Sequence, residues 1–434
     1  MSCLRRFWRL AARRPHLSGL WLSPDFRYLW AAETVSHLGT QLTLVVIPLI
    51  AALVLDATAF EMGLLTAAGG LPRLLIGLVA GVWVDRWPRR PVLLLTDLGR
   101  ALTLLAIPIA ALLGELRIEL LLLVTFLVGA QSVFFNAAWV AFLPGLVGRA
   151  RLADANGKLM ASVSVAQVVG PALAGGLVAL LTAPWVILID AFSFVWSWLL
   201  LQRIRYREPV IARPAAKLGL RREIKEGLAV LVHTPVLRAD AGSMATTVFS
   251  GYMFLAVYVL YLTEHLALSA RGVGLVFACG GIGALVGAVI ASPLATRFGV
   301  GQTILWSCGL FGAFGLTVPL AIFAPRFALP LVLASEFLQW LTLLVYDVNR
   351  VSLRQALTPD HLQGRVSASS QVLVGGMQPL GALAGGFVAT LVGVPATLVL
   401  ACIGMLCSAL WLLRSPIHAF THIPAEAPEP AAVS

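Results

Sequence analysis

The sequence predicts an all-α polytopic membrane protein with twelve transmembrane helices in two pseudo-symmetric six-helix bundles. Three observations lead to this fold class: an apolar composition, twelve apolar segments of membrane-spanning length, and an internal repeat. Hydrophobic residues make up 59% of the 434 residues, and charged residues only 12%. A soluble globular domain carries about a quarter charged residues, so lipid is the solvent that this composition fits.

Each of the twelve segments is close to the length of about 20 mostly apolar residues that a helix needs to cross a bilayer. They are 27–54, 60–84, 91–113, 118–142, 154–181, 185–202, 239–262, 271–295, 303–324, 328–352, 366–390 and 397–413. Most breaks between them are short and carry charges or turn residues, as at 85–90 and 392–395. These breaks are therefore expected to be surface loops.

The longest break divides the chain into two halves. Residues 203–238 are basic and contain three prolines, so we expect a cytoplasmic linker between an N-terminal six-helix bundle (27–202) and a C-terminal six-helix bundle (239–413). Residues 1–26 are expected to form a cytoplasmic N-terminal arm, because they lack the apolar core and cleavage site of a signal peptide. Residues 414–434, rich in alanine and proline, are predicted to be a disordered cytoplasmic tail.

The basic residues are distributed unequally between the two sides of the membrane. An even number of spans places both termini on one side, and 25 of the 31 lysines and arginines fall on that side or in its loops. Only Arg117, Arg271 and Arg326 fall on the other. An excess of basic residues marks cytoplasmic loops, so we expect both termini in the cytoplasm. The same bias explains the net charge of +11 without a nucleic-acid partner.

The two halves are related in sequence. Residues 173–181 recur as 383–391, and the glycines of 63–70 recur in 274–281, at offsets of 210 and 211 residues. These offsets pair span 5 with span 11 and span 2 with span 8, a period of six helices. Internal repeats of this kind are typical of transporters whose halves rock about a site near the middle of the membrane.

The loop after span 2 carries a dense group of charges, in the sequence GVWVDRWPRR from Gly81 to Arg90. A carboxylate with several arginines can form charge-assisted hydrogen bonds with a helix end or a facing acid. The stretch resembles the GxxxDRxxRR loop of the major facilitator superfamily, which implies the major facilitator fold. The resemblance implies a cytoplasmic gate motif, to which we add a bracing Asp–Arg pair of span 3: Gly81, Asp85, Arg86, Arg89, Arg90, Asp97 and Arg100. Alternatively, the loop arginines serve only as topology signals.

Span 5 contains a proline flanked by glycines: Gly170, Pro171, Gly175 and Gly176. Proline frees a backbone carbonyl, and glycines allow close helix packing. The pattern resembles the antiporter motif of drug:proton exporters, although ordinary small-residue packing is the alternative. Two further stretches, 135–156 and 351–366, resemble the exporter group that includes macrolide efflux pumps and the enterobactin exporter. The family's usual arginine in span 4 is replaced by Thr125, so its coupling role cannot be transferred.

Ionisable residues inside the spans are candidates for proton coupling, because charge in the membrane is costly without a partner or water. Glu33, His37 and Gln41 follow one another at intervals of four residues and share a helical face. We expect this face to line the cavity, with Glu33 and His37 carrying protons. Asp190 and Glu336 are the further candidates. The alternative for Glu33 is a structural hydrogen bond to Arg73.

Arg73, near the middle of span 2, is expected to pair with Glu33 or Asp190, or else to bind an anionic substrate. Other polar and aromatic residues of the spans could form the wall of the cavity, because large amphipathic ligands suit aromatic walls with few polar anchors. The full set of substrate-cavity candidates is Gln41, Arg73, Gln131, Trp139, Phe254, Tyr258, Gln339, Trp340 and Tyr346. Each aromatic residue could instead face lipid.

No cofactor or metal is expected, since the chain has no nucleotide-binding loop, no HExxH motif and no metal spacing among its cysteines. An enzyme is not expected either. The sequence predicts a monomeric exporter in the bacterial inner membrane. It would exchange a drug, a macrolide-like natural product or a siderophore for protons by alternating access. The alternatives are a lysophospholipid or other lipid transporter of the same fold, and a non-transporting sensor on a transporter scaffold.

Overall fold

A computed structural model describes residues 19–84, 86–208, 228–229 and 231–424. Within these residues the secondary structure is helical, and twelve helices are long and apolar enough to cross a membrane. The first six are α2 (Pro24–Leu53), α3 (Ala59–Val84), α4 (Arg89–Leu113), α5 (Ile118–Val147), α6 (Leu152–Leu181) and α7 (Ala183–Gln202). Several of them extend beyond the predicted apolar segments, because a helix does not have to end where the hydrocarbon ends.

The second six begin with α9 (Pro235–Leu260), which continues into the π-helical turn η3 (Tyr261–His265). The others are α10 (Ala270–Phe298), α11 (Val300–Gly315), α13 (Ala328–Leu357), α14 (Asp360–Val392) and α15 (Val394–Leu413). Short 3-10 turns accompany them: η1 (Gly19–Leu22), η2 (Arg149–Arg151), η4 (Ala321–Phe323), η5 (Pro325–Phe327) and η6 (Pro416–Ala419).

The ninth predicted span, 303–324, is not one continuous helix. After α11 the chain forms the short helix α12 (Thr317–Leu320) and then η4. Pro319 has no backbone N–H to continue the helical hydrogen bonds. The hydroxyl of Thr317 also donates to the carbonyl of Phe314, over 2.7 Å, and so competes for a group that the helix would use.

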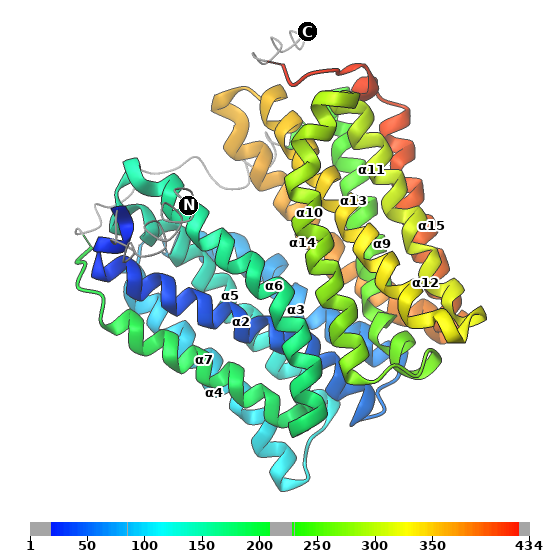
Figure 1. Ribbon diagram of the computed structural model, residues 1–434. Coiled ribbons are helices and arrows are strands. Elements are labelled where there is room, and N and C mark those ends of the chain that lie inside the picture. Colours follow the sequence, from blue (N-terminus) through cyan, green and yellow to red (C-terminus); the bar gives the residue numbers. More distant parts are fainter. Residues whose placement is uncertain (1–18, 85, 209–227, 230, 425–434) are drawn as a thin grey trace, which may run out of the picture.

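The helices are paired in the same way in both halves. In the first half α2 packs on α6 and α7, α5 packs on α3 and α4, and α4 packs on α7. In the second half α9 packs on α14 and α15, α13 packs on α10 and α11, and α11 packs on α15. Each pairing in one half has its counterpart six spans later. The two bundles of Figure 1 are therefore pseudo-symmetric, which confirms the predicted fold class.

The halves meet along two helix pairs, α3 with α14 and α6 with α10. The closest approach is between glycines. A Cβ atom on Gly63 would lie 2.7 Å from the Cα atom of Gly386, and one on Gly175 would lie 2.4 Å from the carbonyl oxygen of Ala270. Backbones can approach this closely only where side chains are absent.

These glycine contacts lie at the end of the molecule opposite to residues 19–24 and 414–424. We call the end that holds those residues the terminal end, and the opposite one the far end. Toward the terminal end, Gly81 of α3, Gly157 of α6 and Gly364 of α14 have no neighbouring atom within 4 Å of the position that a Cβ atom would occupy. The ribbons of the two bundles also diverge toward the chain termini in Figure 1. Among the described residues, the halves are thus in contact at the far end and farther apart toward the terminal end.

The predicted disorder of residues 414–434 is wrong for residues 414–424. The backbone N–H groups of Val300 and Gly301 donate to the carbonyls of Thr421 and Phe420, over 3.3 and 2.8 Å. These N–H groups belong to the first turn of α11, where a helix has no partners of its own for them. Residues 425–434, like residues 1–18 of the N-terminal arm and 209–227 of the linker, lie outside the described residues.

The glycine contact between α6 and α10 can be tested with neighbouring substitutions. We expect Gly175→Val to force the halves apart at the far end, because overpacking a tight contact costs about 1–3 kcal/mol. Gly176→Val should be tolerated, since no atom lies within 4 Å of a Cβ at that position. Thermal unfolding of the purified variants, followed by circular dichroism, measures the difference. Equal unfolding midpoints for the two variants would contradict a tight contact between Gly175 and α10.

Candidate functional site

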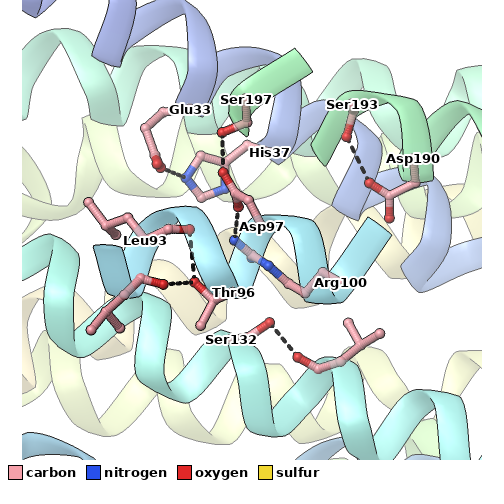
Figure 2. Close-up of polar contacts among 12 residues, drawn as sticks. Glu33, His37, Leu93, Thr96, Asp97, Arg100, Ser132, Asp190, Ser193 and Ser197 are labelled. Carbon is pink, nitrogen blue, oxygen red and sulfur yellow. Dashed lines mark hydrogen bonds and ion pairs between the residues drawn. The ribbon is translucent and has the colours of Figure 1, made fainter. Parts of the chain in front are cut away.

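A buried polar cluster joins three helices of the first half (Figure 2). On α2, the Nε2 atom of His37 lies 3.2 Å from Oε2 of Glu33. On α4, Asp97 forms an ion pair with Arg100 and accepts a hydrogen bond of 2.6 Å from Ser197 of α7. Glu33 is buried, whereas the side chain of His37 is 38% exposed. His37 therefore lies between the buried carboxyl and the solvent-accessible space.

Arg100 is held between two aromatic rings. Its guanidinium carbon lies 4.2 Å from the ring centre of Phe135 on α5 and 4.2 Å from that of Phe194 on α7. Aromatic faces attract a cation most strongly where water is excluded. Both side chains turn into the bundle, and their predicted role in bracing the loop at Asp85 stays a prediction. Asp85 itself lies outside the described residues.

Asp190 extends the cluster along α7. Its carboxylate accepts hydrogen bonds from the hydroxyls of Thr43 and Ser193, over 2.5 and 3.0 Å. Gly39 of α2 makes room for it, since a Cβ there would lie 2.3 Å from the carboxylate. The charge of Arg100 reaches both Asp97 and Asp190, and Glu33 interacts electrostatically with Asp97. Sequence spacing could not bring these residues together, because they come from three separate spans.

The charges of this cluster do not balance. Glu33, Asp97 and Asp190 contribute three carboxyl groups, while Arg100 contributes one permanent positive charge. Even with His37 protonated, full ionisation would leave one negative charge in excess. One oxygen of Glu33, although buried, accepts no hydrogen bond from the described residues. The interior of the first half thus holds more carboxyl groups than cations.

Glu336 occupies the interior of the second half. Its two oxygens accept hydrogen bonds from the phenol of Tyr258, over 2.7 Å, and from the indole of Trp340, over 2.8 Å. Both donors are neutral, and no described cation forms an ion pair with this carboxyl. Glu336 is therefore a second buried acid whose negative charge is not compensated.

A second Asp–Arg cluster, which was not predicted from the sequence, lies nearer the terminal end of the second half. Arg350 of α13 lies 3.3 Å from Asp240 of α9 and 2.6 Å from Asp347, one turn away. In the sequence, Arg350 is only one of the 25 basic residues that indicate the cytoplasmic side. The repeat in spacing could have revealed it, because Asp347 and Arg350 stand three residues apart, as Asp97 and Arg100 do.

Five predicted cavity residues are hydrogen-bonded within their own bundle or buried in this conformation. Gln131 donates to Thr103 on α4, and Gln339 donates to Ser335 on its own helix. Tyr346 is hydrogen-bonded to Ser243, and Phe254 is buried, as is Tyr258. The assignment of these five residues to the cavity stays a prediction. A polar group without water must find a partner inside the protein, which turns such side chains inward.

The remaining cavity candidates are only partly enclosed. Gln41 packs against Gly170 of α6. A Cβ atom added to Gly170 would lie 2.4 Å from the Cβ atom of Gln41. Trp139 is half-buried against the packed side chains at the terminal end of the first half. Trp340 is 40% exposed. Arg73 is exposed and forms no ion pair with any described carboxylate, so the expected pairing with Glu33 or Asp190 is wrong.

The arginines of the gate motif connect α4 to the end of α7. The backbone N–H groups of Arg89 and Arg90 donate to the carboxylate of Glu208, over 2.9 and 2.7 Å. The side chain of Arg90 donates to the carbonyls of Leu201 and Gln202. A carboxylate at a helix start and a cation at a helix end both complement the helix dipole. Arg86 is exposed, and Gly81 has no close neighbour.

The glycines of the antiporter motif have separate surroundings. Gly170 contacts α2 through Gln41, Gly175 contacts α10, and Gly176 has nothing within 4 Å. Pro171 contributes to the same interface, because its carbonyl oxygen would lie 2.5 Å from a Cβ atom on Gly274. In the described residues, no group of three or more acidic, histidine or cysteine side chains could hold a metal ion.

Two bundles of six helices related by pseudo-symmetry, closed at one end and separated at the other, define a transporter of the major facilitator superfamily. The chain belongs to that superfamily and to its family described as transmembrane secretion effector, whose model matches residues 21–432. It is thus a multi-pass membrane protein of a transporter family. The predicted family is confirmed.

Named relatives lie within the same superfamily. The chain is 28% identical to the multidrug efflux pump Tap of Mycolicibacterium fortuitum, over 86% of this chain and 91% of that protein. It is 29% identical to the enterobactin exporter EntS of Escherichia coli, over 81% and 82%. It is also 30% identical to the uncharacterized transporter YfiS of Bacillus subtilis, but over only 48% of this chain and 49% of that one.

Solved structures share the fold at low sequence identity. A bacterial homologue of the iron transporter ferroportin, in an inward-facing state, gives a TM-score of 0.73 at 18% identity, over 90% of this chain and 98% of the other. The nucleoside transporter NupG gives 0.70 at 12% identity, over 90% and 99%. These similarities establish the architecture alone.

The ion pair of Arg100 should be essential to the stability of the first half. We expect Arg100→Gln to destabilise the protein by about 3–5 kcal/mol, because it leaves Asp97 buried without its cation. Adding Asp97→Asn should restore part of the loss. Lys158→Gln, which breaks the more exposed pair with Asp154 on α6, should cost at most about 1 kcal/mol. The three variants are compared by their thermal unfolding midpoints. Similar effects of Arg100→Gln and Lys158→Gln would be inconsistent with a buried ion pair of Arg100 between two aromatic rings.

Proposed function

We propose that the protein is an efflux transporter that exports a hydrophobic or amphipathic small molecule in exchange for protons, by alternating access. The observation that carries the proposal is the excess of buried carboxyl groups over cations around Glu33. Such a cluster can gain and lose protons without breaking the fold. The names of two relatives, a multidrug efflux pump and an enterobactin exporter, support export as the direction.

The proton path that we propose begins at His37 and ends at Glu33. His37 is partly exposed and contacts Glu33 directly, over 3.2 Å, so it can pass a proton between the accessible space and the buried acid. Histidine suits this step because its charge changes near neutral pH. Protonation of Glu33 would lower the negative charge of the cluster and so change the relative free energies of the two conformations.

The proton gradient provides enough energy for export. One proton that enters down a potential of about 100 mV releases about 2.3 kcal/mol. At about 1.4 kcal/mol per tenfold ratio, this maintains a substrate gradient of roughly 40-fold. Export against such a gradient would lower the concentration of a drug inside the cell and could confer antibiotic resistance.

Coupling can be tested once an exported compound is known. A drug panel in a pump-deficient bacterial host should identify a compound that accumulates less when the protein is present. A protonophore should restore its accumulation. We then expect Glu33→Gln to abolish efflux driven by a pH gradient, because an amide cannot exchange the proton. Glu119→Gln, at an exposed glutamate near the far end, is the matched control and should retain full activity. Transport by Glu33→Gln at the wild-type rate would exclude this role.

We place the terminal end on the cytoplasmic side of a bacterial inner membrane, because the basic residues concentrate there. Cysteines introduced at two exposed positions test this orientation in a background without the five native cysteines. A membrane-impermeant maleimide should label Glu115→Cys in intact cells, but His422→Cys only after permeabilisation. The reverse pattern would invert the proposed topology and the direction of transport.

A lipid substrate is the second candidate, and one groove supports it. Between α2 and α6, a groove of about 500 Å³ is lined mainly by apolar side chains, with Trp30 on one wall and Val165 on the other. Lys158 lies at the same groove and could approach a phosphate headgroup. Transport of a fluorescent lysophospholipid in proteoliposomes, at a rate that exceeds the rate for drugs, would favour this candidate.

A further inference from the structure

Arg73 is the unusual charge of the membrane-spanning region. It is exposed, and it lies 14 residues after the start of α3 and 11 before its end. At 1.5 Å per residue it is about 21 Å from one end of the helix and about 16 Å from the other. A charged side chain at this depth is costly unless it faces a partner or water.

No acid in the described part of the chain neutralises Arg73. The buried carboxyls that could have done so have other partners: Glu33 contacts His37, and Asp190 accepts hydrogen bonds from Thr43 and Ser193. Arg100 and Arg350, which are buried, differ in this respect, because each forms an ion pair. Arg73 therefore keeps an uncompensated positive charge.

The side chain of Arg73 lies on the side of α3 that faces the space between the halves. Leu75, 59% exposed, is two residues further along the helix, which places it about 200° away, on the opposite face. Across from Arg73 are two elements of the second half. Its Cγ atom lies 3.9 Å from a Cβ position on Gly375 of α14, and Tyr252 of α9 is close enough to interact with its charge.

The facing helix of the second half presents little side-chain bulk to Arg73. Gly375 presents no side chain there, and one turn toward the far end Gln378 lies across from Gly70, with its amide oxygen 3.7 Å from a Cβ position on that glycine. The halves are in contact beyond this point, at Gly63 and Gly386, and separate on the other side of it. Arg73 thus lies near the closed end of the space that opens toward the terminal end.

We propose that Arg73 binds the anionic group of the transported molecule, so that the substrate is an amphipathic anion with a carboxylate, sulfonate, phosphate or phenolate. This inference rests on the proposed export function and deepens it. A guanidinium offers a planar pair of donors that matches such groups, whereas Tyr252 supplies an aromatic surface and a hydroxyl. A substrate anion would compensate this positive charge, which no acid among the described residues pairs.

Two dyes with the same ring system but different charge test the proposal. One is 1-anilinonaphthalene-8-sulfonate, an anion, and the other is N-phenyl-1-naphthylamine, which lacks the sulfonate. Binding is measured by equilibrium dialysis against the full chain in lipid nanodiscs, with empty nanodiscs subtracted. We expect wild type to bind the anionic dye at least tenfold more tightly than the neutral one, the ratio that one charge-assisted hydrogen bond supplies.

The variants of Arg73 separate charge from structure. Arg73→Gln should remove the preference for the anionic dye and leave binding of the neutral dye unchanged, whereas Arg73→Lys should retain part of the preference. Arg326→Gln, at an exposed arginine near the far end, is the control and should bind both dyes as wild type does. The inference is overturned if wild type shows no preference for the anion, or if Arg73→Gln keeps it. Because the assay uses no pH gradient, loss of proton coupling would not change its result.

Discussion

The cost of placing charge in hydrocarbon determines how the interior of this protein is arranged. An ionised side chain in the membrane must be paired, enclosed by polarisable groups or exposed to water. Arg100 meets this requirement with Asp97 and two aromatic rings, and Arg350 meets it with two aspartates. Glu33, Asp190 and Glu336 meet it only in part, because their partners are neutral or can lose their charge. In the function proposed above, protonation meets the rest of this requirement for these acids.

The pseudo-symmetry of the fold is closer in backbone than in chemistry. Both halves use the same helix pairings, and both contain an aspartate three residues before a buried arginine. These pairs are on α4 in the first half and on α13 in the second, which are not symmetry counterparts. The first half also gathers three acids around one arginine, whereas Glu336 of the second half is held by Tyr258 and Trp340. The repeated backbone therefore supports different polar interiors.

The sequence predicted the fold well because hydrophobic length and helical repeats are local properties. The same locality placed Glu33 and His37 on one face, as the structure confirms with their direct contact. Local sequence patterns could not predict the contacts between spans that are far apart in the sequence. The bond from Ser197 to Asp97 and the rings of Phe135 and Phe194 around Arg100 depend on how three helices pack. The order of residues 416–424 also depends on tertiary contacts, with the first turn of α11. The break after α11 has local causes in Thr317 and Pro319, which an apolar pattern does not register.

The side chain of Arg100 stiffens the first bundle. It starts on α4, and its rings come from α5 and α7, so a single guanidinium fastens three helices of one bundle. Between the bundles the fastening is of another kind, glycine backbone against glycine backbone at one end. The first is stiff and directional, while the second includes no ion pair among the described residues. Each half is therefore suited to move as a rigid body, with the change concentrated at the interface between the two halves.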